Sequence, residues 1–322
     1  MTINELSIDT QNTWALLIGT GTFEDTQFPN IPAAENNLNS LRELLKNPKI
    51  VGIPERQIML VKDQTNLYNH LDKLLRESLP QQVDTIIIYY IGHGIYKPDG
   101  LYLTAMDTLQ SNFKTGLAFG DLWELTYKRA KNLLYILDCC NSGKAMDSMR
   151  KVTQKNMSIL TSTLPTDNAK APTDAPYTAF TANLLNLLAQ GCGSEPTVTP
   201  SILFDGLKVL LREQGFPEPW HNDYYEEPIR FARNWAYSTI PHFQVPSRNS
   251  SVLDNLVNGI NQLKFLWKKQ YVLALISSIG IILLIALVLG VKSCHPNQSS
   301  EGDCSPIMDN VSVGNDLSIS CD

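Results

Sequence analysis

Two short apolar segments, each followed at once by a reactive side chain, constrain this chain more than any other feature. The first, residues 84–91 (DTIIIYYI), leads into a Gly-His-Gly sequence centred on His93. The second, residues 133–137 (LLYIL), leads into Asp138 and two adjacent cysteines. Apolar runs this short are typical of strands that are buried on both faces of a parallel sheet. Because such sheets bind ligands beyond the carboxyl ends of their strands, we expect the histidine and a thiol at one edge.

The segments around these two runs alternate between strand and helix patterns. Residues 33–46, for example, repeat apolar side chains at helical spacing, whereas residues 14–19 form another short apolar run. This alternation predicts an α/β fold of three layers, an α/β/α sandwich with a mostly parallel sheet covered on both faces. The other predicted strands are 57–62, 157–161 and an edge strand at 227–233, and the other predicted helices are 67–79, 119–130, 177–190 and 199–214.

A histidine and a cysteine at neighbouring strand ends make a nucleophilic pair. Cysteine attacks carbonyl carbons as its thiolate, and a nearby imidazole makes the thiolate accessible near neutral pH. His93 and Cys140 are 47 residues apart, and the glycines beside the histidine let backbone or ligand approach closely. The alternative interpretation is that both adjacent cysteines are buried structural residues. The sequence shows no spacing of Cys and His that is typical of a metal site.

The sequence YYIGHG followed by YILDCCNSG resembles the caspase-like cysteine peptidases, in particular their metacaspase and bacterial orthocaspase branch. The resemblance covers about residues 14–232, and caspases carry their histidine about 50 residues before the cysteine. It implies a caspase-like fold and a protein or peptide substrate. In the pattern Asp-x-Cys-x-Ser-Gly the nucleophile is the third residue, Cys140, so Cys139 is a small packed hydrophobe. His93 would carry the proton, and the N–H groups of Gly94 and Cys140 would form the oxyanion hole.

The resemblance also assigns a role to Asp138. In metacaspase-like enzymes the Asp of Asp-x-Cys lines a pocket for Arg or Lys, and a carboxylate there can pair bidentately with Arg. The alternative is a strand-end residue that caps the following turn. Two positions depart from the family pattern, because Asn37 stands where a second acid is common and Ile91 where a small polar residue is common. Many metacaspases use calcium, and calcium activation stays open here, although no dense carboxylate cluster demands it.

A long apolar segment follows the predicted domain. Residues 271–291 run for 21 residues without a charge, long enough for a helix to span a bilayer; the alternative is a buried core helix. Lys264, Lys268 and Lys269 precede the span and only Lys292 follows it, which predicts a cytoplasmic catalytic domain and an outer C-terminus. The predicted organisation is a polar tail at 1–12, a peptidase domain at 13–235, a linker and stalk helix at 236–270, a transmembrane helix at 271–291 and an outer tail at 292–322.

Composition narrows the classes of partner. A formal net charge of −6 argues against a general nucleic-acid binder. No apolar stretch follows Met1, so we expect no cleaved signal peptide and reduced cysteines in the cytosol. These features predict a membrane-anchored cysteine endopeptidase that acts on cytosolic proteins, and bacterial relatives of this kind are linked to programmed cell death and antiviral defence. The other hypothesis is a catalytically silent scaffold or sensor at the membrane, and either could need an activating partner or self-association.

Overall fold

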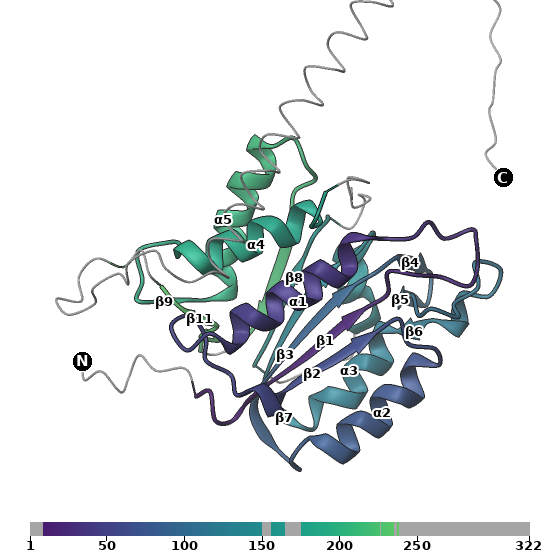
Figure 1. The fold of residues 1–322 in the computed structure, drawn as a ribbon, viewed down its shortest axis with the longest axis horizontal. Coiled ribbons are helices and arrows are strands. Elements are labelled where there is room, and N and C mark those ends of the chain that lie inside the picture. Colours follow the sequence, from purple (N-terminus) through teal and green to yellow (C-terminus); the bar gives the residue numbers. More distant parts are fainter. Residues whose placement is uncertain (1–8, 150–155, 165–174, 226, 235–236, 238–322) are drawn as a thin grey trace, which may run out of the picture. The chain divides into compact units, whose positions relative to one another are not determined.

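The computed structural model describes residues 9–149, 156–164, 175–225, 227–234 and 237. Their centre is a six-stranded sheet in the order β10-β8-β7-β3-β1-β2 (Figure 1). The strands from β8 to β2 run parallel, and β10 pairs with β8 in the antiparallel direction at one edge. The strands are β1 Thr13–Gly19, β2 Ile58–Lys62, β3 Val83–Ile91, β7 Ala130–Asp138, β8 Asn156–Thr161 and β10 Trp220–Tyr224.

Helices cover both faces of this sheet, so the predicted three-layer α/β architecture is confirmed (Figure 1). Successive side chains of β3 point to opposite faces, and its central tyrosines show this clearly. Tyr89 packs in the core under α1, α4 and α5, and Tyr90 packs in the core under α2 and α3. The helices are α1 Ala33–Lys46, α2 Leu67–Ser78, α3 Phe119–Tyr127, α4 Ala179–Gln190 and α5 Pro200–Glu213.

The register between β3 and β7 places the two reactive segments side by side. These strands are neighbours in the sheet, and Ile91 at the end of β3 lies opposite Asp138 at the end of β7. His93 and Cys140 each follow two residues beyond this matched pair. The expectation that both reach the same edge of the sheet is therefore confirmed by the strand register.

Smaller elements complete the described fold. Directly after His93 the chain enters a three-stranded antiparallel sheet in the order β4-β5-β6, beyond the carboxyl end of β3 (Figure 1). The remaining elements are β4 Gly94–Lys97, β5 Gly100–Leu103, β6 Leu117–Ala118, the short β9 Thr197–Val198 with its partner β11 Ala232–Arg233, and the 3₁₀ helices η2 Glu55–Gln57, η3 Phe113–Thr115 and η4 Ser142–Met149.

Three predicted segments differ from the structure. The edge strand of the main sheet is β10 rather than residues 227–233, of which only Ala232 and Arg233 form a strand, paired with β9. The predicted helix 119–130 ends at Tyr127, because Ala130 already pairs with β3 as the first residue of β7. The polar composition of residues 144–155 predicts a loop, but residues 144–149 belong to η4.

The predicted membrane span follows the described residues in the sequence. Across the ranges given above, no helix combines the length and the apolar character that crossing a bilayer needs. Three predicted segments lie outside the described residues, except for Tyr237: the linker and stalk, the span 271–291 and the outer tail. The described residues all belong to the first of two units, residues 1–268, into which the chain divides.

Candidate active site

The segments that follow β3 and β7 are in direct contact. A Cβ atom added to Gly94 would lie only 2.1 Å from the backbone carbonyl oxygen of Cys140, so the two main chains touch where a side chain would otherwise stand. One residue further on, the side-chain amide of Asn141 donates a hydrogen bond to the carbonyl oxygen of Gly94 at 3.3 Å. The structure thus brings the predicted residues His93, Gly94 and Cys140 into one site at the sheet edge.

The imidazole of His93 is oriented by the loop between β1 and α1. Its Nε2 atom lies 2.8 Å from the carbonyl oxygen of Pro29. A carbonyl oxygen only accepts hydrogen bonds, so Nε2 carries the proton and Nδ1 of the neutral ring is left as the basic nitrogen. Phe28 stacks on the ring at a centroid distance of 5.5 Å and an angle of 25°, and Phe23 contacts it at 4.9 Å.

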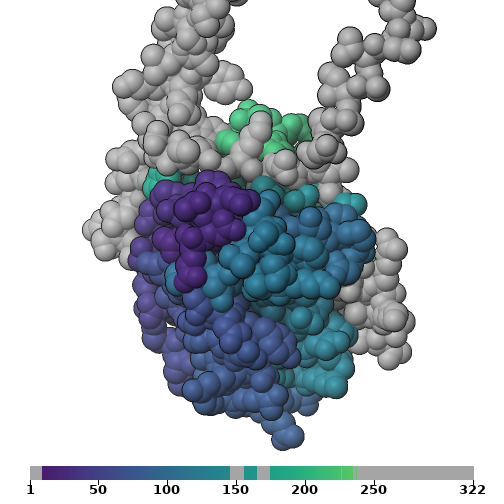
Figure 2. Space-filling view, turned by 90° about the vertical axis from the view of Figure 1, so that its right-hand side faces the viewer, coloured from purple at the N-terminus to yellow at the C-terminus, as the bar shows by residue number. Residues whose placement is uncertain are grey.

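This β1–α1 loop is itself tied to the segment that connects β5 and β6. The backbone N–H of Glu24 donates to the carbonyl oxygen of Met106 at 2.9 Å, and the carboxylate of Asp25 accepts from the N–H of Gln110 at 2.8 Å. Figure 2 shows the dark-purple N-terminal segment lying directly against the blue-teal surface of the β4–β6 region. The loop that orients His93 is therefore braced by the segment that follows His93.

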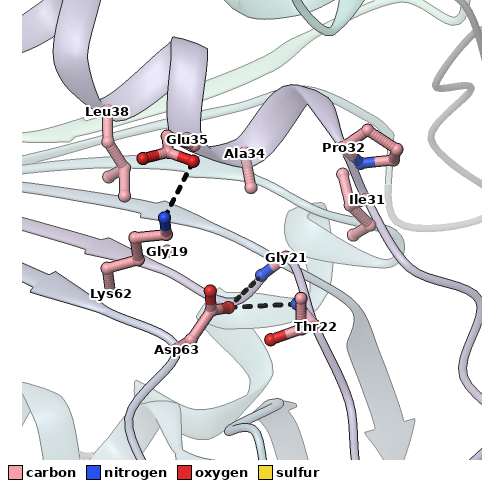
Figure 3. Close-up of a pocket in the computed structure, with 10 residues that line it drawn as sticks. All are labelled: Gly19, Gly21, Thr22, Ile31, Pro32, Ala34, Glu35, Leu38, Lys62 and Asp63. Atoms are coloured by element: carbon pink, nitrogen blue, oxygen red, sulfur yellow. Dashed lines mark hydrogen bonds and ion pairs between the residues drawn. The ribbon is translucent and has the colours of Figure 1, made fainter.

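The base of the same loop is fixed at the end of β2. Oδ1 of Asp63 accepts hydrogen bonds from the backbone N–H groups of Gly21 and Thr22, at 2.7 and 3.0 Å (Figure 3). Beside it, Lys62 and Glu35 form an ion pair at 2.8 Å across a cavity of about 140 Å³. The Asp63 carboxylate thus fixes the start of the loop, and the Lys62–Glu35 pair joins β2 to α1.

The two adjacent cysteines lie in different environments. Cys139 is only 1% exposed and packs among the apolar side chains under α2 and α3. Burial raises the pKa of its thiol well above the ordinary value, and the neighbouring Cys140 and Asp138 raise it further. Cys140 is partly exposed at the strand end. A thiolate is disfavoured at Cys139, so Cys140 is the better candidate for a nucleophile.

Asp138 lies in a buried network of neutral groups. Its side chain is 5% exposed, and its Oδ2 accepts hydrogen bonds from the hydroxyl groups of Thr178 and Thr181 and, at 3.5 Å, from the amide of Asn37. Burial raises the pKa of Asp138, although these hydrogen bonds act in the opposite direction. Thr178 also caps the N-terminus of α4, so the carboxyl group ties the end of β7 to α1 and α4.

Several groups that shape the site were not predicted from the sequence. The Pro29 carbonyl belongs to the backbone and has no sequence signature, while Phe23 and Phe28 fall in a segment that reads only as a loop. Within the part of the chain that the structure describes, no three His, Cys, Asp or Glu side chains converge in an arrangement that could hold a metal ion. The chemistry available at the site is that of an oriented imidazole and a partly exposed thiol on two backbone segments that touch.

Comparison with known proteins identifies the fold and the family. The chain is similar in fold to the crystal structure of caspase-1 from Spodoptera frugiperda, with a TM-score of 0.51 and 12% sequence identity over 70% of this chain and 92% of that chain. A search of curated proteins finds no significant match. The sequence pattern of the family described as Caspase domain matches residues 12–215, which is more than half of the chain. The chain therefore belongs to the caspase domain family.

Proposed function

We propose that this protein is a caspase-like cysteine endopeptidase in which Cys140 is the nucleophile and His93 is the general base and acid. The observation that carries the proposal is the hydrogen bond between His93 Nε2 and the Pro29 carbonyl oxygen. This hydrogen bond leaves Nδ1 as the ring atom that can accept a proton. The next residue, Gly94, packs against the Cys140 backbone. A base that is oriented by a third group is one part of the arrangement that activates a thiol, and this supports the proposal.

The proposed reaction proceeds in two acyl-transfer steps. His93 Nδ1 takes the proton of the Cys140 thiol, and the thiolate attacks the carbonyl carbon of the scissile peptide bond. The C–N bond then breaks, and the imidazolium returns its proton to the leaving amine. Water, deprotonated by His93, attacks the resulting thioester, which releases the acid product and restores the Cys140 thiol.

The oxyanion of each tetrahedral intermediate needs hydrogen-bond donors fixed in advance. We assign this role to the backbone N–H groups of Gly94 and Cys140. The direct packing of Gly94 on the Cys140 carbonyl group supports the assignment, because it holds the two peptide units at a constant separation. Donors that do not reorganise during the reaction contribute most to such catalysis.

Specificity for Arg or Lys at P1 is our first proposal, with Asp138 as the counter-charge. The position of Asp138 in the Asp-x-Cys motif supports it. The buried network works against it, because Oδ2 of Asp138 is already engaged by Thr178 and Thr181 and a guanidinium group would have to displace these hydroxyl groups. An uncharged P1 residue is the alternative, and the substitution Asp138→Asn separates the two because only a basic P1 residue requires the charge.

The finer features of the proposal rest on the sequence. We propose that the chain belongs to the metacaspase and orthocaspase branch, that residues 271–291 cross a membrane with the catalytic domain in the cytoplasm, and that its proteolysis serves cell death or antiviral defence. Alkaline carbonate extraction and protease protection of the full chain in vesicles test the topology. Release of the chain by carbonate would contradict a transmembrane anchor.

Peptide cleavage by the full chain tests the activity. Peptides with Arg, Lys, Asp or Leu at P1 would be offered with and without calcium to the wild type, to Cys140→Ala and to Cys139→Ala. We expect turnover that is abolished in Cys140→Ala and largely kept in Cys139→Ala, which removes one sulfur from the adjacent buried position. A folded wild-type protein that cleaves none of the peptides and no cytosolic protein would favour the silent scaffold.

A further inference from the structure

The backbone of His93 is held on both sides by one residue, Thr104. The N–H of His93 donates to the Thr104 hydroxyl oxygen at 3.1 Å, and the N–H of Thr104 donates to the carbonyl oxygen of His93, also at 3.1 Å. The Thr104 hydroxyl oxygen lies 3.1 Å from the same carbonyl oxygen. Thr104 is fully buried, so water does not compete for these bonds.

The strand register explains why a hydroxyl group is needed at this point. The β4–β5 ladder ends with Gly94 opposite Leu103, so His93 and Thr104 are the next pair beyond it. At this pair the Thr104 hydroxyl group serves as the acceptor for the His93 N–H. A buried N–H group without an acceptor is costly, so the side chain at position 104 decides whether His93 keeps this backbone position.

A second hydroxyl group supports the same peptide unit. The Tyr90 hydroxyl group lies 3.0 Å from the carbonyl oxygens of both His93 and Thr104. A Cβ atom added to Gly92 would lie 2.1 Å from this hydroxyl oxygen, which explains the glycine before His93. Thr20 in turn donates to the Thr104 carbonyl oxygen at 2.9 Å. Thr104 is thus at the centre of a buried network that surrounds the His93 backbone.

We propose that Thr104 is the positioning residue of the catalytic histidine. Its hydroxyl group fixes the His93 backbone so that the ring reaches the Pro29 carbonyl oxygen with Nε2 and keeps Nδ1 free for the thiol. Thr104 acts through His93, and the inference rests on the proposed peptidase function. A displacement of about 1 Å at a catalytic group can cost about 100-fold in rate, so losing this support should be visible in turnover.

Three substitutions in the full chain test the role of the hydroxyl group. Thr104→Val keeps the shape and removes the oxygen, Thr104→Ser keeps the oxygen, and Thr126→Val removes a hydroxyl group that is equally buried but bonds to Tyr135 and to backbone in α3. We expect kcat to fall about 10- to 100-fold in Thr104→Val with KM changed less than about 3-fold. Thr104→Ser and Thr126→Val should keep kcat within about 3-fold of the wild type.

Two kinetic results would overturn the inference. The first is a kcat of Thr104→Val that equals that of the wild type. The second is an equal loss of kcat in Thr104→Val and Thr126→Val, since a general effect of burial would then explain both. If Thr104→Val does not fold, Thr104→Ala removes the oxygen without the branched methyl groups and carries the same expectations.

A measurement without substrate separates this inference from the proposed function. In the full chain with ¹⁵N-labelled histidine, NMR reports the tautomer of the His93 ring. We expect the Nε2–H form in the wild type and in Thr104→Ser, and a mixture of both tautomers in Thr104→Val. Absence of turnover in the wild type would contradict the peptidase proposal alone, whereas one unchanged tautomer in all three proteins would contradict the role of Thr104.

Discussion

Nε2 of His93 lies 2.8 Å from the carbonyl oxygen of Pro29, although the two residues are 64 positions apart in the chain. The contact joins the end of β3 to the loop after β1, which is the neighbouring strand in the sheet. It determines which ring nitrogen carries the proton, and it does so with a backbone atom that substitution of a side chain leaves in place. Tests of this relationship must therefore act on the side chains that hold the ring.

Phe28 is the most direct of these side chains. It is buried and stacks on the His93 ring, so Phe28→Leu keeps an apolar side chain and removes the flat surface. We expect kcat for peptide cleavage to fall about 10-fold with little change in KM, because the imidazole can then rotate away from Pro29. Phe113→Leu is the control, since Phe113 packs edge-on against Tyr102 instead. Equal kcat values in the two variants would contradict a role for the stacking.

Gly94 is the position at which the smallest side chain should abolish activity. A methyl group there would meet the Cys140 carbonyl oxygen at 2.1 Å, so Gly94→Ala must separate the two backbone segments that carry the proposed oxyanion donors. We expect a loss of at least about 100-fold in kcat, the effect of removing one such donor. Activity near the wild-type level would exclude the assigned oxyanion hole.

Gly206→Ala provides the matched control for this substitution. Gly206 lies inside α5, and an added methyl group would meet only the terminal methyl groups of Leu187 at 3.0 Å, which can move aside. Alanine also favours a helix interior by about 1 kcal/mol over glycine. We expect this variant to keep full activity and the stability of the wild type or better.

The buried carboxyl group of Asp138 should be visible in the pH dependence of stability. Burial raises the pKa of Asp138 in the folded state above its unfolded value of about 4. At any pH between these two pKa values, the folded protein binds more protons at this group than the unfolded protein does. Its contribution to the free energy of unfolding therefore falls as the pH rises through this window. Asp138→Asn removes that loss, so the free energy of unfolding of the variant relative to wild type should increase from pH 4 to pH 7.

Asp223 on β10 supplies the opposite case for the same measurement. Burial alone would raise its pKa, but hydrogen bonds from His221, Ser158 and Tyr225 outweigh burial and lower it. The stability it contributes is present above the unfolded pKa and is lost as the pH falls through the folded pKa. Relative to wild type, Asp223→Asn should therefore lose stability as the pH rises from 2 to 5. The free energy of unfolding would be measured for both variants and wild type across these pH ranges. A difference from wild type that stays constant at every pH would contradict this account.

The placement of His93 and the two cysteines at one sheet edge could be predicted from the sequence because each follows a short apolar run, whereas the choice of Cys140 rests on the resemblance to the caspase-like peptidases. Strands of that kind are buried and parallel, and their carboxyl ends meet at one edge. The predicted helix 33–46 agrees with α1 at both ends, because Leu38, Leu41 and Leu45 repeat at helical spacing on its buried face. The local pattern and the tertiary fold agree at these positions, so these elements could be predicted from a single sequence.

The supports of His93 could not be predicted in the same way. The contacts of Pro29 and Thr104 with His93 depend on where a loop and a hairpin return to the end of β3. The spacing of apolar residues in the sequence carries no information about that position. The edge strand β10 was missed for a different reason. Its sequence WHNDY has no apolar run, because an edge strand is paired on one side only and its side chains here are partly exposed. The predicted roles of residues beyond position 237 stay predictions.

The most direct test of the central claim is the pH dependence of thiol alkylation in the full chain. Iodoacetamide would be supplied in limiting amount to the wild type and to His93→Ala, and tandem mass spectrometry would assign the label to Cys139 or Cys140. The account predicts rapid labelling of Cys140 near neutral pH in the wild type, a large loss of that rate in His93→Ala, and no labelling of Cys139 in either protein. Labelling of Cys140 at the same rate in both proteins, or preferential labelling of Cys139, would contradict a Cys140 nucleophile activated by His93.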